Sequence, residues 1–163
     1  MAMSMGMMTA APPLVLALLL QVATPGTAPT PPAAPAASTP PAAPADKEAA
    51  AKAAARRAAE AWLVVVDKGD YAGSWDSTSS VLQKAYPRKT WARLLEEMRK
   101  PVGAVQSRVF KEADHGIDPP GAPRGEYVSI RFTTTFKNRK SSTETVTPKL
   151  EGGVWRVSGY FIK

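Results

Sequence analysis

Glu144 is the side chain in this sequence best placed to carry proton chemistry. It lies in an alternating run, on the side that also bears Val146 and Leu150 and that we expect to be apolar. A carboxylate there must be paired, exposed at a strand end, or have a raised pKa. If Glu144 lies in a pocket with Tyr71 or Trp75, it would be a catalytic acid/base. Tyr71 is the second candidate catalytic residue. Paired with a nearby Lys or Arg, it would be structural.

His115 is the only histidine and is flanked by Asp114 and Asp118. Such a set could ligate a metal or act as a general base. We expect a solvated loop histidine instead, because the surrounding Pro/Gly-rich run cannot place ligands firmly. We therefore predict no metal and no cofactor. Zinc, EF-hand and phosphate-loop spacings do not occur in the sequence.

Cysteine is absent from the sequence. Its absence excludes disulfides, thiolate-bound metals, cysteine nucleophiles and a lipid-carrying anchor.

A third candidate is the polar side of the predicted sheet, where hydroxyl and cationic side chains alternate with apolar ones. We select Arg131, Arg156 and Tyr160 on this side as ligand-binding residues. Such a surface could receive an anionic polymer, another protein, or a second copy of the chain as a homodimer. The alternative is an ordinary solvated face, where threonine is simply a good strand former.

The chain is basic, with 21 Lys and Arg against 14 Asp and Glu, a net charge of +7. Basic proteins often bind nucleic acid. Here the cations are scattered, and an exported protein would not meet nucleic acid, so we expect none. An anionic envelope component is the electrostatic partner that we predict.

The charge also divides the chain, since residues 1–45 contain no charged side chain. Residues 1–23 hold an apolar run too short to span a membrane comfortably, which is typical of a signal peptide. An uncleaved apolar leader held at the membrane is the alternative. Residues 24–45 form a Pro/Ala-rich linker in which neither helix nor sheet can form. Residues 46–163 are long enough for one domain. We therefore predict an exported protein, periplasmic or extracellular.

The first half of the domain has helical periodicity. We predict a helix capped by Asp46 and ended by Gly69, with Ala54, Ala58, Trp62 and Val65 on one face. A short second helix spans "DYAGSWDS". A third, Arg88 to Lys100, carries an apolar stripe of Trp91, Leu94, Leu95 and Met98.

The second half alternates with a period of two, which predicts strands over 105–112, 126–136, 143–150 and 154–162. Val128, Ile130 and Phe132 should lie beneath the helices. Pro148 places the third strand at an edge or at a bulge. The last strand, with large apolar residues on both sides, is expected inside the sheet. The fold class is α+β, with about three N-terminal helices packed on one face of a four-stranded antiparallel sheet.

Several blocks occur in an order that resembles a bacterial exported family, domain of unknown function 4019: "AAEAWLVVVDKGDYAGSW", "WARLLEEMRKPVGAVQSR", "PGAPRGEYVSIRF", "ETVTP" and "WRVSGYFIK". The resemblance covers Ala58 to Lys163. It implies a cone-like α+β fold similar to nuclear transport factor 2 and the cystatins, and no activity. Fold alone does not assign chemistry.

These observations predict an exported protein of unknown function that is a non-catalytic binding or envelope-associated accessory module. The alternative is a small cofactor-independent isomerase, lyase or hydrolase that uses a carboxylate acid/base in the cone pocket.

Overall fold

A computed structural model describes residues 43–163. The predicted leader, residues 1–23, and nearly all of the predicted linker lie outside the described residues. The first helix begins at Pro44, two residues before the predicted cap at Asp46, and Ala43 occupies the N-cap position. Proline suits the first helical turn because its missing N–H would have no partner there.

The helices precede the strands, as expected for an α+β protein. Three helices occupy roughly the predicted positions, and the short helix α3 was not predicted. The side chain of Ser79 caps α3 by accepting from the Leu82 N–H at 3.3 Å. The bounds are α1 Pro44–Asp67, α2 Tyr71–Ser74, the 3₁₀ helix η1 Trp75–Ser77, α3 Ser80–Ala85 and α4 Arg88–Val102.

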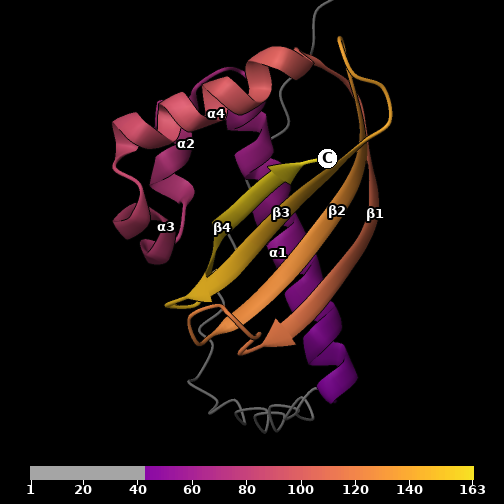
Figure 1. The fold of residues 1–163 in the computed structure, drawn as a ribbon. Coiled ribbons are helices and arrows are strands. Elements are labelled where there is room, and N and C mark those ends of the chain that lie inside the picture. Colours follow the sequence, from indigo (N-terminus) through magenta and orange to yellow (C-terminus); the bar gives the residue numbers. More distant parts are fainter. Residues whose placement is uncertain (1–42) are drawn as a thin grey trace, which may run out of the picture. The chain divides into compact units, whose positions relative to one another are not determined.

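Four antiparallel strands form one sheet in the order β1-β2-β3-β4 (Figure 1). β3 therefore lies inside the sheet, and β4 lies at its edge, contrary to the prediction for the last strand. A parallel bridge between Thr78 and Val157 covers part of the β4 edge. The bounds are β1 Val105–Ile117, β2 Glu126–Phe136, β3 Ser142–Glu151 and β4 Val154–Ile162.

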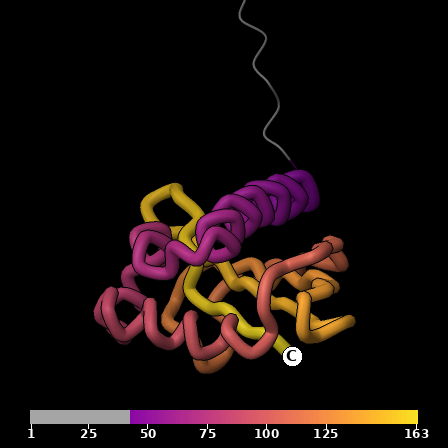
Figure 2. Tube along the Cα trace, turned by 90° about the horizontal axis from the view of Figure 1, so that it is seen from above, coloured from indigo at the N-terminus to yellow at the C-terminus, as the bar shows by residue number. Residues whose placement is uncertain are grey.

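α1 packs against one face of the sheet, which we call the inner face (Figures 1 and 2). Val128, Ile130 and Phe132 on this face are at most 2% exposed, which confirms that they lie beneath the helices. From α1 the buried residues are Ala55, Ala59, Trp62, Leu63 and Val66, so the packed stripe is displaced by one residue from the predicted one at all positions but Trp62.

The opposite, outer face bears the polar residues of β2, as predicted. β4 departs from the prediction because Ser158 forms a bulge: Thr147 pairs with Gly159, and Pro148 pairs with Val157. A bulge inserts one residue and reverses the facing of everything after it. Tyr160 consequently points to the inner face and is only 4% exposed. Its predicted position on the polar face is wrong for this reason. Of the two alternatives for Pro148, the bulge is confirmed.

Candidate functional site

Glu144 lies on the inner face of β3 and is completely buried. Its Oε1 accepts from the Tyr160 hydroxyl at 2.5 Å and from Arg99 Nη1 at 3.2 Å. Its Oε2 accepts from Arg108 Nε at 2.6 Å and from Thr134 Oγ1 at 2.8 Å. Both oxygens are thus committed to protein donors.

Asp67, in the last turn of α1, completes the charge balance. Its oxygens accept from Arg99 Nη2 at 2.7 Å and from Arg108 Nη1 at 2.7 Å. Two cations therefore face two carboxylates, and every charge has a partner of opposite sign. We call Asp67, Arg99, Arg108, Thr134, Glu144 and Tyr160 the ionic network.

The pKa shifts in the ionic network favour its charged arginines and its neutral phenol. Burial alone would lower the pKa of Arg108, but the hydrogen bonds that it donates to Asp67 and Glu144, and the negative charge of these two carboxylates, raise it. Burial raises the pKa of Tyr160, and the negative charge of Glu144 raises it further. The phenol consequently stays protonated and donates to the carboxylate.

This geometry supports the structural interpretation of Glu144, in which its carboxylate is paired with arginine, and not the catalytic one. A general acid or base must reach a substrate within hydrogen-bond distance, and no part of Glu144 is exposed. Tyr71 is not among the partners of Glu144; it lies partly buried against the apolar core. The ionic network therefore links α1, α4 and the sheet.

Sequence reasoning missed Asp67, Arg99 and Arg108. A signal for Arg99 was present, because it follows Trp91 and Leu95 at helical spacing on the apolar stripe of α4, and it is 4% exposed. An arginine on such a stripe implies a buried acceptor. Arg108 lies on the same side of β1 as Phe110, the side that faces α1.

The two predicted arginines of the outer face are not brought together. Arg131 stands opposite Thr145 in the register and Arg156 opposite Lys149, four positions farther along β3. Arg131 Nη2 lies 2.6 Å from Asp114, and its Nε lies 2.7 Å from Glu112. Arg156 donates to the backbone oxygen of Asp76 at 3.3 Å. It has no carboxylate partner among residues 43–163.

His115 is a strand residue rather than a loop residue, because β1 continues to Ile117. Its Nε2 lies 2.8 Å from Glu126, not beside Asp114 or Asp118. Asp114 pairs with Arg131, and Asp118 accepts from the Gly125 N–H. Among residues 43–163, no three His, Asp or Glu side chains converge in a way that could hold a metal ion.

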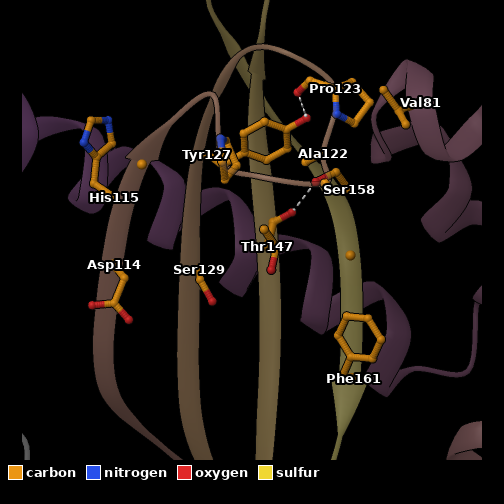
Figure 3. A pocket seen from close by; sticks show the side chains of 14 residues that line it. Val81, Asp114, His115, Ala122, Pro123, Tyr127, Ser129, Thr147, Ser158 and Phe161 are labelled. Carbon is orange, nitrogen blue, oxygen red and sulfur yellow. Dashed lines mark hydrogen bonds between the residues drawn. The ribbon is translucent and has the colours of Figure 1, made fainter.

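The outer face carries a pocket of about 470 Å³ under the β1–β2 connection. Strands β2, β3 and β4 form its floor, and Val81 of α3 forms one wall (Figure 3). Its size falls within the range of ~300–1,000 Å³ typical of small-molecule sites. The pocket is separate from the ionic network, which lies on the inner face.

None of the helices in the described part of the chain is long and apolar enough to cross a membrane. The chain matches no curated protein and no solved structure. The model of one family, described as protein of unknown function (DUF4019), matches residues 58–160. That match spans most of the folded region and includes the whole ionic network and every residue that lines the outer-face pocket except Phe161. The chain therefore belongs to the DUF4019 family of proteins of unknown function.

Proposed function

We propose that this protein is an exported, non-catalytic binding module that works as an envelope-associated accessory. Its binding surface is the outer face of the sheet. α1 packs on the inner face, so the outer face of strands β2 to β4 is left for a partner. Arg156 supplies a cation there that no carboxylate of the described residues neutralises.

The observation that carries this proposal is the burial of Glu144. Glu144 is the candidate acid/base of the alternative function, an isomerase, lyase or hydrolase, and the exposed fraction of its side chain is zero. Releasing it for catalysis would leave Asp67 as the only carboxylate partner of both Arg99 and Arg108, at a cost of roughly 3–5 kcal/mol. A stable fold therefore keeps this group away from any substrate.

We also propose that the fold is cone-like. A long helix against an antiparallel sheet supports a cone-like arrangement similar to nuclear transport factor 2 and the cystatins. Folds of this kind host enzymes and binding modules alike, so the assignment rests on the site and not on the fold.

Export is supported by the composition of residues 1–45, an apolar run followed by a Pro/Ala tract without charge. A fusion of residues 1–45 to alkaline phosphatase, which is active only after export, tests this directly. Export predicts an active fusion that loses activity when charged residues interrupt the run Leu14 to Leu20. Equal activity of both fusions, or none, would contradict export.

Envelope association is tested by cosedimentation of the full chain with vesicles of phosphatidylethanolamine and phosphatidylglycerol. The proposal predicts binding that weakens as salt is added, because exposed charges are screened over about 10 Å at 0.1 M salt. Arg156→Glu should lower the bound fraction strongly. Arg57→Glu makes the same charge change on α1 and is the matched control, with little effect expected. Equal loss in both variants would mean that net charge alone drives binding, which contradicts a role for the outer face.

A further inference from the structure

The outer-face pocket is lined by elements far apart in sequence. Its floor is formed by strands β2 to β4, and the β1–β2 connection arches over them opposite α3 (Figure 3). Most of the side chains that line it are apolar: Val81, Pro119, Ala122, Pro123, Tyr127 and Phe161. Phe161 is 61% exposed and adds an aromatic ring to this contiguous apolar lining.

The arch over the pocket is held by its own hydrogen bonds. The Asp118 N–H donates to the Gly125 carbonyl at 2.8 Å, and the Gly125 N–H donates back to Asp118 Oδ1 at 2.7 Å. The Tyr127 hydroxyl donates to the Pro123 carbonyl at 2.7 Å (Figure 3). The pocket is therefore formed before any ligand arrives, which lowers the entropy cost of binding.

The carboxylate that lines the pocket already has a counter-charge. Asp114 is paired with Arg131 at 2.6 Å. The His115 side chain is occupied by Glu126, with 2.8 Å between Nε2 and the carboxylate oxygen. A charged ligand would lose its hydration here without gaining a free counter-charge. The pocket consequently favours an uncharged ligand.

Two hydroxyl groups are available for polar contact. Ser129 and Thr147 lie on neighbouring strands and line the pocket (Figure 3). Neither hydroxyl is hydrogen-bonded to another residue in the described part of the chain. Beside them, Gly159 has no side chain to fill the floor. A Cβ added to Gly159 would lie 3.6 Å from both Thr147 and Phe161. This is ordinary contact distance, so a side chain at Gly159 would point into the cavity without a clash at its first carbon.

We propose that this pocket binds a small, uncharged, mainly apolar molecule whose polar atoms hydrogen-bond to the hydroxyls of Ser129 and Thr147. This inference rests on the proposed binding function and names the ligand class for its outer face. Apolar surface drives the binding, at roughly 25 cal/mol per Å² buried. The two hydroxyls orient the ligand on the floor.

The test uses the full chain and N-phenylnaphthylamine, an uncharged fluorophore with one N–H group. We expect a saturable rise in fluorescence with one probe per chain. Gly159→Leu fills the floor and should weaken binding at least tenfold, about 1.4 kcal/mol. Ala122→Trp fills the pocket from the exposed arch, where it does not disturb the sheet, and should act alike. Val109→Ala is the control: it shortens an exposed apolar side chain on β1 that does not line the pocket, and it should leave binding unchanged.

Binding that survives both filling variants would overturn the assignment, as would the lack of saturable binding to the wild-type chain. The sulfonated analogue, anilinonaphthalene sulfonate, should bind more weakly in the same pocket. Tighter binding of this anion, lost in Gly159→Leu, would contradict an uncharged ligand. The vesicle assay reports separately: probe binding without vesicle binding overturns only the envelope role, and vesicle binding without probe binding overturns only the pocket assignment.

Discussion

The Tyr160 hydroxyl lies 2.5 Å from Glu144 Oε1, and both residues are buried on the inner face of the sheet. The ring of Tyr160 packs edge-on against Trp62, with 5.1 Å between the ring centres. One side chain thus joins the apolar core to the ionic network. Tyr160 reaches this position only because Ser158 bulges out of the β4 ladder.

Glu144→Gln should strongly destabilise the fold. The amide keeps the shape but removes a negative charge, so that the buried Arg99 and the partly buried Arg108 face only Asp67. Breaking a buried ion pair in this way costs about 3 kcal/mol or more. Chemical denaturation measures the loss. Glu97→Gln removes an exposed carboxylate paired with Arg93 and should change the free energy of unfolding by less than about 0.5 kcal/mol. A similar small change in both variants would contradict a structural role for Glu144.

Tyr160 should make the fold sensitive to alkaline pH. Burial and the charge of Glu144 raise its pKa above the ordinary value near 10. A group whose pKa is raised on folding contributes stability that is complete below its unfolded pKa and is lost as the pH rises above it. The stability advantage of wild type over Tyr160→Phe should therefore shrink as the pH rises from about 9 to 11. Tyr86→Phe, at an exposed tyrosine, is the control. A constant advantage of wild type over Tyr160→Phe would contradict the expected shift.

Deletion of Ser158 should be far more damaging than Ser158→Ala. The deletion removes the bulge and turns Tyr160 outward while Phe161 turns inward, which separates the phenol from Glu144. We expect a loss of about 3 kcal/mol or more, or failure to fold. Ser158→Ala keeps the bulge and removes only the hydrogen bond to the Thr147 carbonyl, a loss of about 1 kcal/mol. Equal stability of the two variants would show that the bulge does not set the facing of Tyr160.

Gly125→Ala should loosen the arch over the pocket. Gly125 has φ of +146°, and an added Cβ would come within 2.7 Å of Lys149 Cε. Only glycine adopts this conformation readily, and the strain is about 1–3 kcal/mol. Gly116→Ala is the matched control for stability, because nothing lies within 4 Å of the added carbon; Gly116 itself lines the pocket. Unfolding free energies for both variants, with probe affinity measured alongside, decide the point. A harmless Gly125→Ala would show that the arch tolerates a side chain.

Much of the architecture was predictable because it follows from periodicity. Val128, Ile130 and Phe132 alternate so regularly that only one face of β2 could be buried. The Gly152 and Gly153 turn also follows from the sequence, since both residues have the positive φ that glycine accommodates. The α+β order follows from helical spacing before Gly103 and strand spacing after it.

The errors arise where a local pattern was overruled by the rest of the fold. Strict alternation placed Tyr160 with Arg156, and a single bulged residue reversed that. The sequence predicts β4 inside the sheet because it carries large apolar residues on both sides, yet Trp155 packs on the core while Phe161 is exposed. The sequence predicts a loop at His115 because prolines follow closely, whereas β1 runs through this residue to Ile117.

The ionic network could be foreseen only in part. Glu144 on an apolar side required a partner, but its arginine partners lie 45 and 36 positions away, in α4 and β1. Sequence spacing cannot pair residues across such distances without the strand register. The pocket was equally hidden, because its arch, floor and wall come from three separate regions of the chain.

The central claim is that the inner face holds the fold together while the outer face binds. The affinity of Glu144→Gln for N-phenylnaphthylamine tests it most directly, at a temperature where circular dichroism shows the variant to be folded. We predict an affinity within about twofold of wild type, because the ionic network does not line the pocket. A tenfold loss in the folded variant would contradict the claim and return Glu144 to the site.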